Sequence, residues 1–410
     1  MSHHPRRYSM PRQRLVMDRR TATQAARRAI RASKPRPEKP NSQMDPIVLF
    51  VVVTLVMVGL MVVYAVTFHR GMSFLKWQVA RAGIGLLALF AGVRLRHSLF
   101  AGPKLRLVML FGIVGLLLAT IVIGRSVGVA TRWLGFIQPA ELAKFVLPMW
   151  LAAYFADLKE KPARDWNLKK SVLVPGGVVV VFLVLTLVQP AISTTVIVAA
   201  SAFLMFLIVG VKLRFLVPIG LVAASLVFAA IRYTPYAQQR IREWREGDRY
   251  QQKQSLIAFG SGGLVGKGLG EGKQKFYFLP KLHTDFIVAA VGEEFGFLGS
   301  LALFALYGTF LVGGMLVGLR ANSHFGQYLS CGIVITIFMY AMVHMGVALG
   351  ILPPTGQPLP FVSFGGSALV TNLFAAGVLL NVSRFQRRPD EGPAGRGWNR
   401  RPRLSRAGTR

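Results

Sequence analysis

Long runs of apolar residues dominate the chain and indicate its architecture. Four runs contain no charged residue: 47–67, 107–124, 215–231 and 295–319. An α-helix needs about 20 apolar residues to cross the hydrocarbon core of a bilayer. These four runs therefore predict four transmembrane helices.

Two longer stretches each predict a pair of helices. Residues 171–211 carry no charge and are broken near the middle by Gln189-Pro190. Residues 325–383 are interrupted at 353–360 by PPTGQPLP, whose four prolines rule out a continuous helix. Two further spans are expected at 77–93, which contains Arg81, and at 138–155, which contains Glu141 and Lys144. The predicted total is about ten transmembrane helices, the fold class of an all-α polytopic membrane protein.

The basic residues of the short loops predict the orientation in the membrane. One group is Arg94, Arg96, Lys104 and Arg106, and the other is Lys159, Lys161, Arg164, Lys169 and Lys170. Because cytoplasmic loops carry the excess of Lys and Arg, both loops and both termini are expected in the cytoplasm. The large loop between helices 7 and 8, at about 232–296, then lies outside the cytoplasmic membrane.

Composition agrees with this picture and separates the tails from the core. Of 410 residues 53% are hydrophobic, yet the net charge is +33. Much of that charge lies in residues 1–44 and 384–410, which are rich in Arg, Pro and Gly and predict disordered cytoplasmic tails around a transmembrane domain at 45–383. Such tails suit anionic lipid heads. The chain offers no base-reading module, so nucleic acid is not an expected partner.

Asp285 is the carboxylate best placed for chemistry. It separates the polar segment KFYFLPKLHT from the apolar run FIVAA. This position predicts the start of a helix, where Asp285 is either an N-cap or a general base held ionised by the helix dipole and nearby lysines. The two interpretations are compatible.

Other polar segments around Asp285 carry alternative interpretations. Lys273 and Lys275, interleaved with aromatic residues, suit a phosphate head group or an interfacial aromatic belt. Arg240 belongs to the charged run 233–250, typical of an amphipathic helix. The glycines of 260–273 lack the spacing of a P-loop and indicate either close approach to a ligand or positive φ angles.

Within the predicted spans, Glu141 and Lys144 share one helical face and form either a structural ion pair or a cavity lining. Gln138-Pro139 should begin that helix. His344, in an apolar run, is interpreted as a packed histidine. The chain shows no HExxH, CxxC or GxSxG motif.

Three ordered motifs resemble one family. They are RWLGFIQPAELAK (132–144), GSGGLVGKGLGEGKQKFYFLPKLHTDFI (260–287) and GILPPTGQPLPFVSFGGSAL (350–369). Together they are similar to the SEDS (shape, elongation, division and sporulation) family of peptidoglycan polymerases, and to its division branch more than its elongation branch. Two positions depart from the family pattern. Ala191 follows Gln189-Pro190 where an acid is usual, and Lys281 follows Leu279-Pro280 where Glu is usual.

The resemblance implies an inverting glycosyltransferase that polymerises lipid II outside the cytoplasmic membrane, at the division septum. It places the catalytic aspartate at Asp285. The expected substrate-binding residues are Lys275, Lys273, His283, Thr284, Arg240, Arg132, Glu141, Lys144, Gln138, Ser363, Gly365 and Gly366. The expected partners are lipid II, the undecaprenyl-pyrophosphate-linked glycan, a class B penicillin-binding protein and other division proteins.

The metal requirement stays open, with a divalent cation such as Mg²⁺ as a candidate for the leaving pyrophosphate. Two rival functions also stay open. A lipid II flippase would use the same polar interior and broken helices, and a noncatalytic division scaffold would need no base at Asp285.

Overall fold

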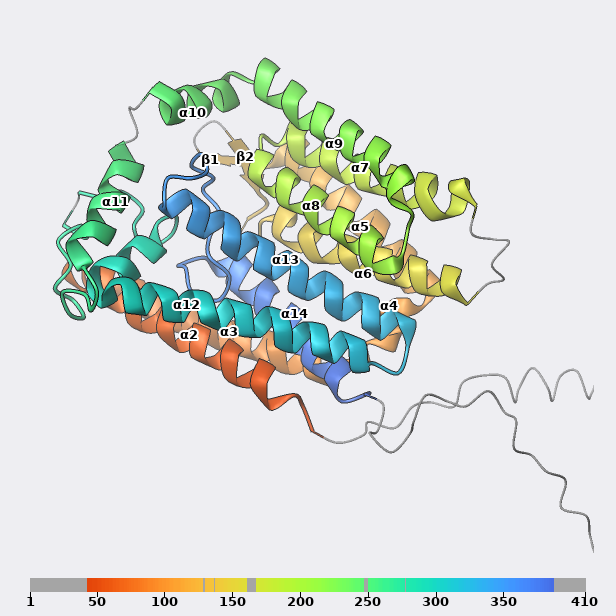
Figure 1. Ribbon diagram of the computed structural model, residues 1–410, viewed down its shortest axis with the longest axis horizontal. Helices are drawn as coiled ribbons and strands as arrows, with labels where there is room; N and C mark the ends of the chain where they lie inside the picture. Colours follow the sequence, from red (N-terminus) through yellow and green to blue (C-terminus); the bar gives the residue numbers. More distant parts are fainter. Residues whose placement is uncertain are drawn as a thin grey trace, which may run out of the picture. The chain divides into compact units, whose positions relative to one another are not determined.

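The computed structural model describes residues 43–386, apart from 128–129, 136, 161–166, 247–249 and 277. Most of the described chain is helical (Figure 1). The elements in chain order are α2 (Pro46–Thr67), η1 (Phe68–Arg70), α3 (Ser73–Arg94), α4 (Ser98–Ala101), α5 (Pro103–Ile123), β1 (Arg125–Val127), β2 (Ala130–Trp133), α6 (Pro139–Lys159), η3 (Lys169–Leu173), α7 (Val174–Val188), α8 (Ile192–Val209), α9 (Leu213–Tyr233), α10 (Pro235–Glu246), α11 (Tyr250–Gly262), α12 (Ile287–Arg320), α13 (His324–Ala348) and α14 (Gly366–Ser383).

The predicted fold class, an all-α polytopic membrane protein, is confirmed. Within the described part of the chain, nine helices are long and apolar enough to cross a membrane. The remaining long helix is α6, whose 21 residues include Glu141 and Lys144, and these charges lower its hydropathy. With α6 included, the structure accounts for the ten predicted spans.

The predicted helix breaks also lie where the prolines placed them. Helix α7 ends at Val188 and α8 begins at Ile192, so Gln189-Pro190 lies in the turn between them. No regular element occupies the proline segment between α13 and α14.

At the start of α2, the side chain of Asp45 accepts hydrogen bonds from the backbone N–H groups of Ile47 and Val48, each at 3.1 Å.

The eighth span differs from its prediction. Helix α12 begins at Ile287, eight residues before the expected start, and Gly296 interrupts it with φ 68° and ψ −161°. The segment before Gly296 contains the buried Glu293 and Glu294. These two charged residues lower its mean hydropathy, so the apolar pattern did not predict it as part of the helix. Helix α11 and the β1–β2 hairpin were likewise not predicted, because neither carries a long apolar run.

Small residues bring α3 and α14 into close contact. A Cβ atom added at Gly377 would lie 2.1 Å from the carbonyl oxygen of Leu89, and one at Gly92 would lie 2.6 Å from that of Phe374. Backbones this close leave no room for side chains, which is how small residues stabilise helix pairs in membranes. Glycine is therefore required at both positions.

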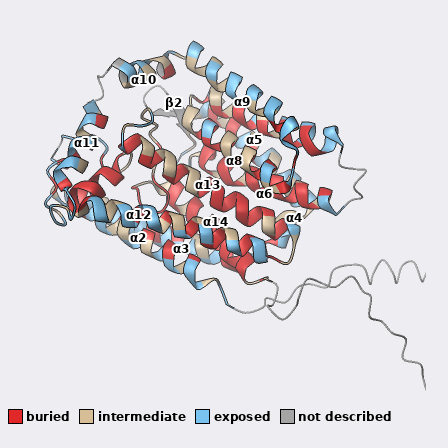
Figure 2. Ribbon diagram, in the orientation of Figure 1, coloured by how far each residue is buried: buried red, intermediate tan, exposed pale blue. Residues whose placement is uncertain are grey.

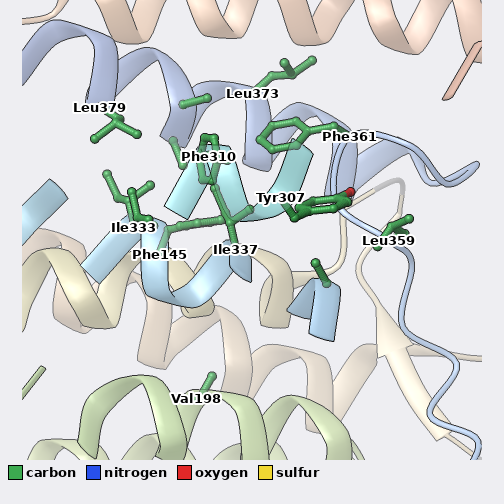
Figure 3. Packing of buried hydrophobic residues seen from close by; sticks show 14 of the residues in the cluster. Phe145, Val198, Tyr307, Phe310, Ile333, Ile337, Leu359, Phe361, Leu373 and Leu379 are labelled. Carbon is green, nitrogen blue, oxygen red and sulfur yellow. The ribbon is translucent and has the colours of Figure 1, made fainter. Parts of the chain in front are cut away.

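The core of the bundle includes buried residues of α2, α6, α8, α12, α13, α14 and the loop that follows α13. Phe310 and Phe361 meet edge to face with ring centroids 5.9 Å apart, and the Tyr307 hydroxyl donates to the carbonyl of Pro360 (Figure 3). Figure 2 shows α13 and α14 largely buried, whereas α9 is exposed along most of its length. Exposed apolar residues such as Phe111 and Phe228 suit contact with lipid tails.

The two ends of the bundle carry different connections. Figure 1 shows α10 and α11 at one end and α4, within the basic connection between α3 and α5, at the other. The prediction that this basic end faces the cytoplasm therefore places α10 and α11 on the outer side.

Candidate functional site

A tight turn presents Asp285 at the α10–α11 end of the bundle. The backbone of Lys281 has φ 57°, and its carbonyl accepts hydrogen bonds from the N–H groups of Thr284 (3.0 Å) and Asp285 (2.9 Å). Helix α12 starts two residues later, and its N-cap residue is Phe286. The N-cap interpretation of Asp285 is therefore wrong, although the residue still lies beside the positive end of the helix.

Ser363 fixes this turn from the segment that precedes α14. Its hydroxyl donates to the carbonyl of Thr284 (2.7 Å) and accepts from the N–H of Leu359 (2.9 Å), and the N–H of Phe364 donates to the carbonyl of His283 (3.0 Å). Ser363 is buried and uses its hydroxyl within the protein. In this structure it supports the Asp285 turn, and its predicted contact with substrate stays a prediction.

Asp285 lines a polar cavity of about 420 Å³. The described wall combines two cations, one acid, three aromatic residues, two glutamines and a few smaller residues: Arg240, Trp244, Tyr250, Gln251, Gln252, Lys281, Asp285, Phe286, Val347, Pro354, Thr355 and Gly356. Helices α10 and α11 contribute five of these residues. They are bound to the end of α13 and the loop beyond it. Gln252 donates to the carbonyls of Val347 (3.2 Å) and Leu352 (2.7 Å), and Trp244 donates to that of Gly350 (3.2 Å).

Asp285 and Arg240 both lie close to Gly356. A Cβ atom at Gly356 would lie 3.7 Å from Oδ2 of Asp285 and 3.9 Å from Nη2 of Arg240. Gly356 also has φ 65°, a conformation that other residues adopt only with strain. Nη1 of Arg240 donates to the carbonyl of Pro354 at 2.6 Å, which directs the guanidinium to this point of the wall.

An apolar cavity adjoins the polar one. Arg240, Pro354 and Thr355 line both cavities. The apolar cavity, of about 190 Å³, in turn shares Val196, Val227 and Ile231 with a larger apolar groove of about 630 Å³ among α7, α8 and α9. Polar and apolar surfaces therefore follow one another from Asp285 toward the lipid-facing side of the bundle.

His283 lies next to the turn but packs among aromatic rings. Its ring centroid is 5.3 Å from that of Phe74 and 5.6 Å from that of Phe364. Burial, with a smaller contribution from the charge of Arg70, lowers the pKa of His283 to about 4. The imidazole is therefore neutral near pH 7. The Thr284 hydroxyl donates to the carbonyl of Lys281 (3.1 Å), and neither side chain lines the polar cavity.

The two predicted lysines lie away from Asp285. Lys275 is buried, and its Nζ donates to the carbonyls of Ala65 on α2 (3.4 Å) and of Gly270. Nζ also lies 4.5 Å from the ring centroid of Phe68. Lys273 is exposed, and its backbone N–H donates to Oε1 of Glu293 (2.8 Å). Neither lysine lines the polar cavity, and their predicted contacts with substrate remain untested.

The glycine-rich segment has a structural role at the kink of α12. A Cβ atom at Gly266 would lie 2.2 Å from the carbonyl oxygen of Glu294, and one at Gly262 would lie 1.9 Å from that of Gly292. Glu293 binds the same segment through Nζ of Lys267 (3.1 Å) and the N–H of Gln274 (3.1 Å). Of the two interpretations, close backbone packing with positive φ angles is the one that the structure supports.

Glu141 and Lys144 form a buried ion pair on α6, and each is about 1% exposed. Nζ of Lys144 also lies 4.1 Å from the ring centroid of Tyr340 on α13. The pair lies inside the bundle, as the resemblance implied, and does not line the polar cavity. Helix α6 begins at Pro139 as predicted, with the N–H of Gln138 donating to the Ser367 hydroxyl (3.3 Å).

The remaining predicted residues have other surroundings. Gly365 is the N-cap of α14, and a Cβ atom at Gly366 would lie 3.0 Å from Nε of Arg81. Arg132 lies on β2, and its side chain is outside the described residues. Among the predicted site residues whose side chains the structure describes, only Asp285 and Arg240 line the polar cavity.

The described residues contain no group of three His, Cys, Asp or Glu side chains placed to hold a metal ion. Asp285 is the one carboxylate among the described residues of the polar cavity wall. Because Mg²⁺ is commonly bound by one or two carboxylates together with waters and substrate phosphates, Asp285 could supply one ligand to a divalent cation that also binds phosphate oxygens.

Comparison with known proteins identifies the family. A family model described as cell cycle protein, FtsW/RodA/SpoVE, matches residues 43–388. The chain belongs to this family.

The alignments with two curated relatives cover nearly the whole length of each relative. A probable peptidoglycan glycosyltransferase FtsW of Geobacter metallireducens is 34% identical over 365 residues, 84% of this chain and 96% of the relative. Stage V sporulation protein E of Bacillus subtilis is 33% identical over 367 residues, 85% of this chain and 99% of the relative. The predicted resemblance to SEDS proteins of the FtsW type is confirmed.

Solved structures share the fold. The rod shape determining protein RodA of Thermus thermophilus aligns with a TM-score of 0.64 and 26% identity, covering 84% of this chain and 98% of that one. A chain from a study of polymerization and crosslinking by a peptidoglycan synthase complex aligns with a TM-score of 0.69 and 26% identity, covering 84% and 99%.

This FtsW/RodA/SpoVE member also has cavity residues that sequence reasoning missed. Trp244, Tyr250, Gln252 and Lys281 line the polar cavity, yet none was predicted to bind substrate. The one available signal was the replacement of the family's usual Glu by Lys281, which places an additional cation in the cavity wall. Nothing local distinguishes Gln252 from the other glutamines of α11.

Proposed function

We propose that this chain is a peptidoglycan glycosyltransferase that polymerises lipid II in septal synthesis, with Asp285 as the general base. The observation that carries the proposal is the position of Asp285 in a polar cavity that adjoins an apolar one. Lipid II has a sugar–pyrophosphate head and a polyprenyl tail, so it needs both kinds of surface side by side. The names of the curated relatives support the same reaction.

The chemistry is one displacement at an anomeric carbon. The 4-hydroxyl oxygen of the incoming sugar forms a bond to the anomeric carbon while the bond between that carbon and the pyrophosphate oxygen breaks. This single displacement inverts the configuration at the anomeric carbon. The hydroxyl proton passes to Asp285. Because a carboxylate is too weak a base to ionise a sugar hydroxyl beforehand, proton transfer accompanies bond formation.

The negative charge on the leaving pyrophosphate requires more electrostatic stabilisation than the proton transfer to Asp285 does. Cations placed next to the pyrophosphate stabilise the transition state. Arg240 and Lys281 line the same cavity as Asp285 and supply this charge. The fork of Arg240 suits two phosphate oxygens at once. A divalent cation bound by the pyrophosphate would add to this charge compensation when present.

The apolar cavity and the groove among α7, α8 and α9 are the proposed path of the polyprenyl tail. Their linings are apolar apart from Ser193, Arg240, Thr355 and Gln357 in the apolar cavity. The head would then stand at the α10–α11 end of the bundle, which we place outside the cytoplasmic membrane. Both termini would lie in the cytoplasm.

A class B penicillin-binding protein is the proposed partner that crosslinks the new strand. It is supported by the aligned chain from the study of a peptidoglycan synthase complex. Co-purification with candidate transpeptidases of the same organism, followed by polymerisation assays with and without each one, tests this partnership.

The decisive experiment compares the purified protein with its Asp285→Asn variant in a gel assay of lipid II polymerisation. We expect glycan strands from the parent and none from the variant at equal folded protein. Extension by Asp285→Asn at near the parent rate refutes the role of Asp285.

Proteoliposomes with fluorescent lipid II test the two rival functions. Transfer of lipid II between leaflets without glycan products would favour a flippase. Normal septation in cells that carry Asp285→Asn would favour a scaffold.

A further inference from the structure

The segment Pro353 to Pro360 separates the two cavities. Gly356 lines the polar cavity, Gln357 lines the apolar cavity, and Pro354 and Thr355 line both. Gly356 is also the residue that faces Asp285 and Arg240. The position of this segment therefore sets the shape of the proposed active site.

The segment cannot hold itself in place with regular backbone hydrogen bonds. Four of its eight residues are prolines, which have no N–H to donate. Three of its carbonyls instead accept from side chains of three different helices. The donors are Arg240 of α10 to Pro354, His344 of α13 to Gln357, and Tyr307 of α12 to Pro360.

His344 is the donor that binds the residue directly after Gly356. Its Nδ1 lies 2.8 Å from the carbonyl oxygen of Gln357, the residue after Gly356. Because a carbonyl oxygen only accepts, Nδ1 must carry the proton. The side chain of Gln357 is held as well, since its Nε2 donates to the Thr194 hydroxyl on α8 at 3.1 Å.

The burial of His344 makes this hydrogen bond costly to lose. His344 is 1% exposed, and the described residues offer Nε2 no partner. If the imidazole were removed, the carbonyl of Gln357 would lose its donor with little water to replace it. The proline segment would then be free to move relative to Asp285.

We propose that His344 is a positioning residue: through Nδ1–H it holds Gln357, and thereby keeps Gly356 against Asp285 and Arg240. This inference rests on the proposed function of the cavity. It assigns His344 a role beyond the packing that its apolar surroundings indicate.

Four variants test the role. His344→Asn places an amide N–H close to the position of Nδ1, whereas His344→Gln places its N–H near that of Nε2 and His344→Leu has no donor. The matched control is His97→Leu, because His97 is also buried and its Nδ1 lies 2.9 Å from Oδ1 of Asn381. His97 lies between α3 and α4, at the other end of the bundle.

The first measurement is amide hydrogen exchange of the peptide that contains 355–364. We expect faster exchange in His344→Leu and His344→Gln, and parent-like exchange in His344→Asn and His97→Leu. Unchanged exchange in His344→Leu overturns the proposal whether or not the protein polymerises lipid II.

The second measurement is kcat and KM for lipid II at equal amounts of folded protein. We expect kcat to fall about 10-fold in His344→Leu and His344→Gln, the effect of losing one ordinary hydrogen bond, with KM within about 3-fold of the parent. His344→Asn should restore kcat. Equal losses in His344→Asn and His344→Leu, or a similar fall in His97→Leu, would show a merely structural role.

These results separate this inference from the proposed function. A parent protein that makes no glycan would contradict the proposed function, while the exchange data would still decide whether His344 holds the segment. An active parent with parent-like kcat in His344→Leu would contradict the inference alone.

Discussion

Gly356 leaves its side-chain position empty opposite Asp285, where an added Cβ would lie 3.7 Å from the carboxylate oxygen Oδ2. A single methyl group at this position would enter the polar cavity between the proposed base and Arg240. The proposed site therefore depends on a glycine at position 356 as well as on the carboxylate of Asp285.

The first prediction concerns this glycine. Gly356→Ala should lower kcat/KM for lipid II by about 10-fold, because its methyl group narrows the cavity and its positive φ adds about 1–2 kcal/mol of strain. The control is Gly350→Ala. Gly350 has φ 74°, and a Cβ atom added there would lie 3.6 Å from its nearest neighbour, Cδ1 of Leu256. Gly350→Ala therefore adds similar backbone strain without a methyl group beside Asp285. Equal activity in the two variants would argue against a role for Gly356 in the cavity.

The second prediction concerns the charge of Arg240. Arg240→Gln should raise KM for lipid II and lower kcat/KM by at least about 10-fold, since the wall loses a charged hydrogen bond to pyrophosphate. Arg242→Gln makes the same substitution on an exposed residue of α10 and should stay within about 2-fold of the parent. Steady-state polymerisation at several lipid II concentrations measures both. A parent-like KM in Arg240→Gln would contradict the assignment.

The third prediction concerns pH. The pKa of His283 falls from 6.5 to about 4 on folding, so between these values the unfolded chain binds a proton that the folded protein does not. The stability that His283 contributes is present above pH 6.5 and is lost as pH falls toward 4. The thermal unfolding midpoint should therefore fall by more between pH 7 and pH 4.5 in the parent than in His283→Phe.

His324→Phe, which changes an exposed histidine at the start of α13, serves as the control for this pH experiment. It should show the same pH-dependent drop as the parent. An equal drop in the parent and in His283→Phe would show that protonation of His283 does not limit stability.

The fourth prediction concerns the glycine-rich segment. Gly262→Ala should lower the free energy of unfolding by about 1–3 kcal/mol or prevent folding, because its Cβ would lie 1.9 Å from the carbonyl oxygen of Gly292. Gly260→Ala, two residues earlier on α11, meets nothing within 4 Å and should be neutral or stabilising by about 0.5–1 kcal/mol. Thermal unfolding in detergent distinguishes them. Equal midpoints would mean that α11 and α12 are not in close contact.

Several side-chain positions that the sequence did not predict have one physical cause. Lys275 has the charge to bind a phosphate, yet its Nζ lies near backbone carbonyls and the ring of Phe68. Trp244 and Gln252 showed no local sign of function, yet they line the cavity with Asp285. Side-chain direction in a loop depends on contacts with distant elements, which a local pattern does not contain.

His344 illustrates the same limit inside a helix. Its apolar surroundings correctly predicted burial, and the structure agrees. The partner that makes this burial specific is a carbonyl in the proline segment beyond α13, and that partner could not be read from helical spacing. Periodicity predicts which face of a helix is buried but not which polar groups meet there.

By itself, the sequence determined which segments cross the membrane, where prolines break them, and that Asp285 lies between a polar segment and an apolar run. These properties depend on the hydropathy and backbone chemistry of neighbouring residues. Only the tertiary structure decided which side chains accompany Asp285, because Arg240 and Gly356 are separated from it by 45 and 71 positions. The packing of α10, α11 and the proline segment at one end of the bundle brings these three residues to the same cavity.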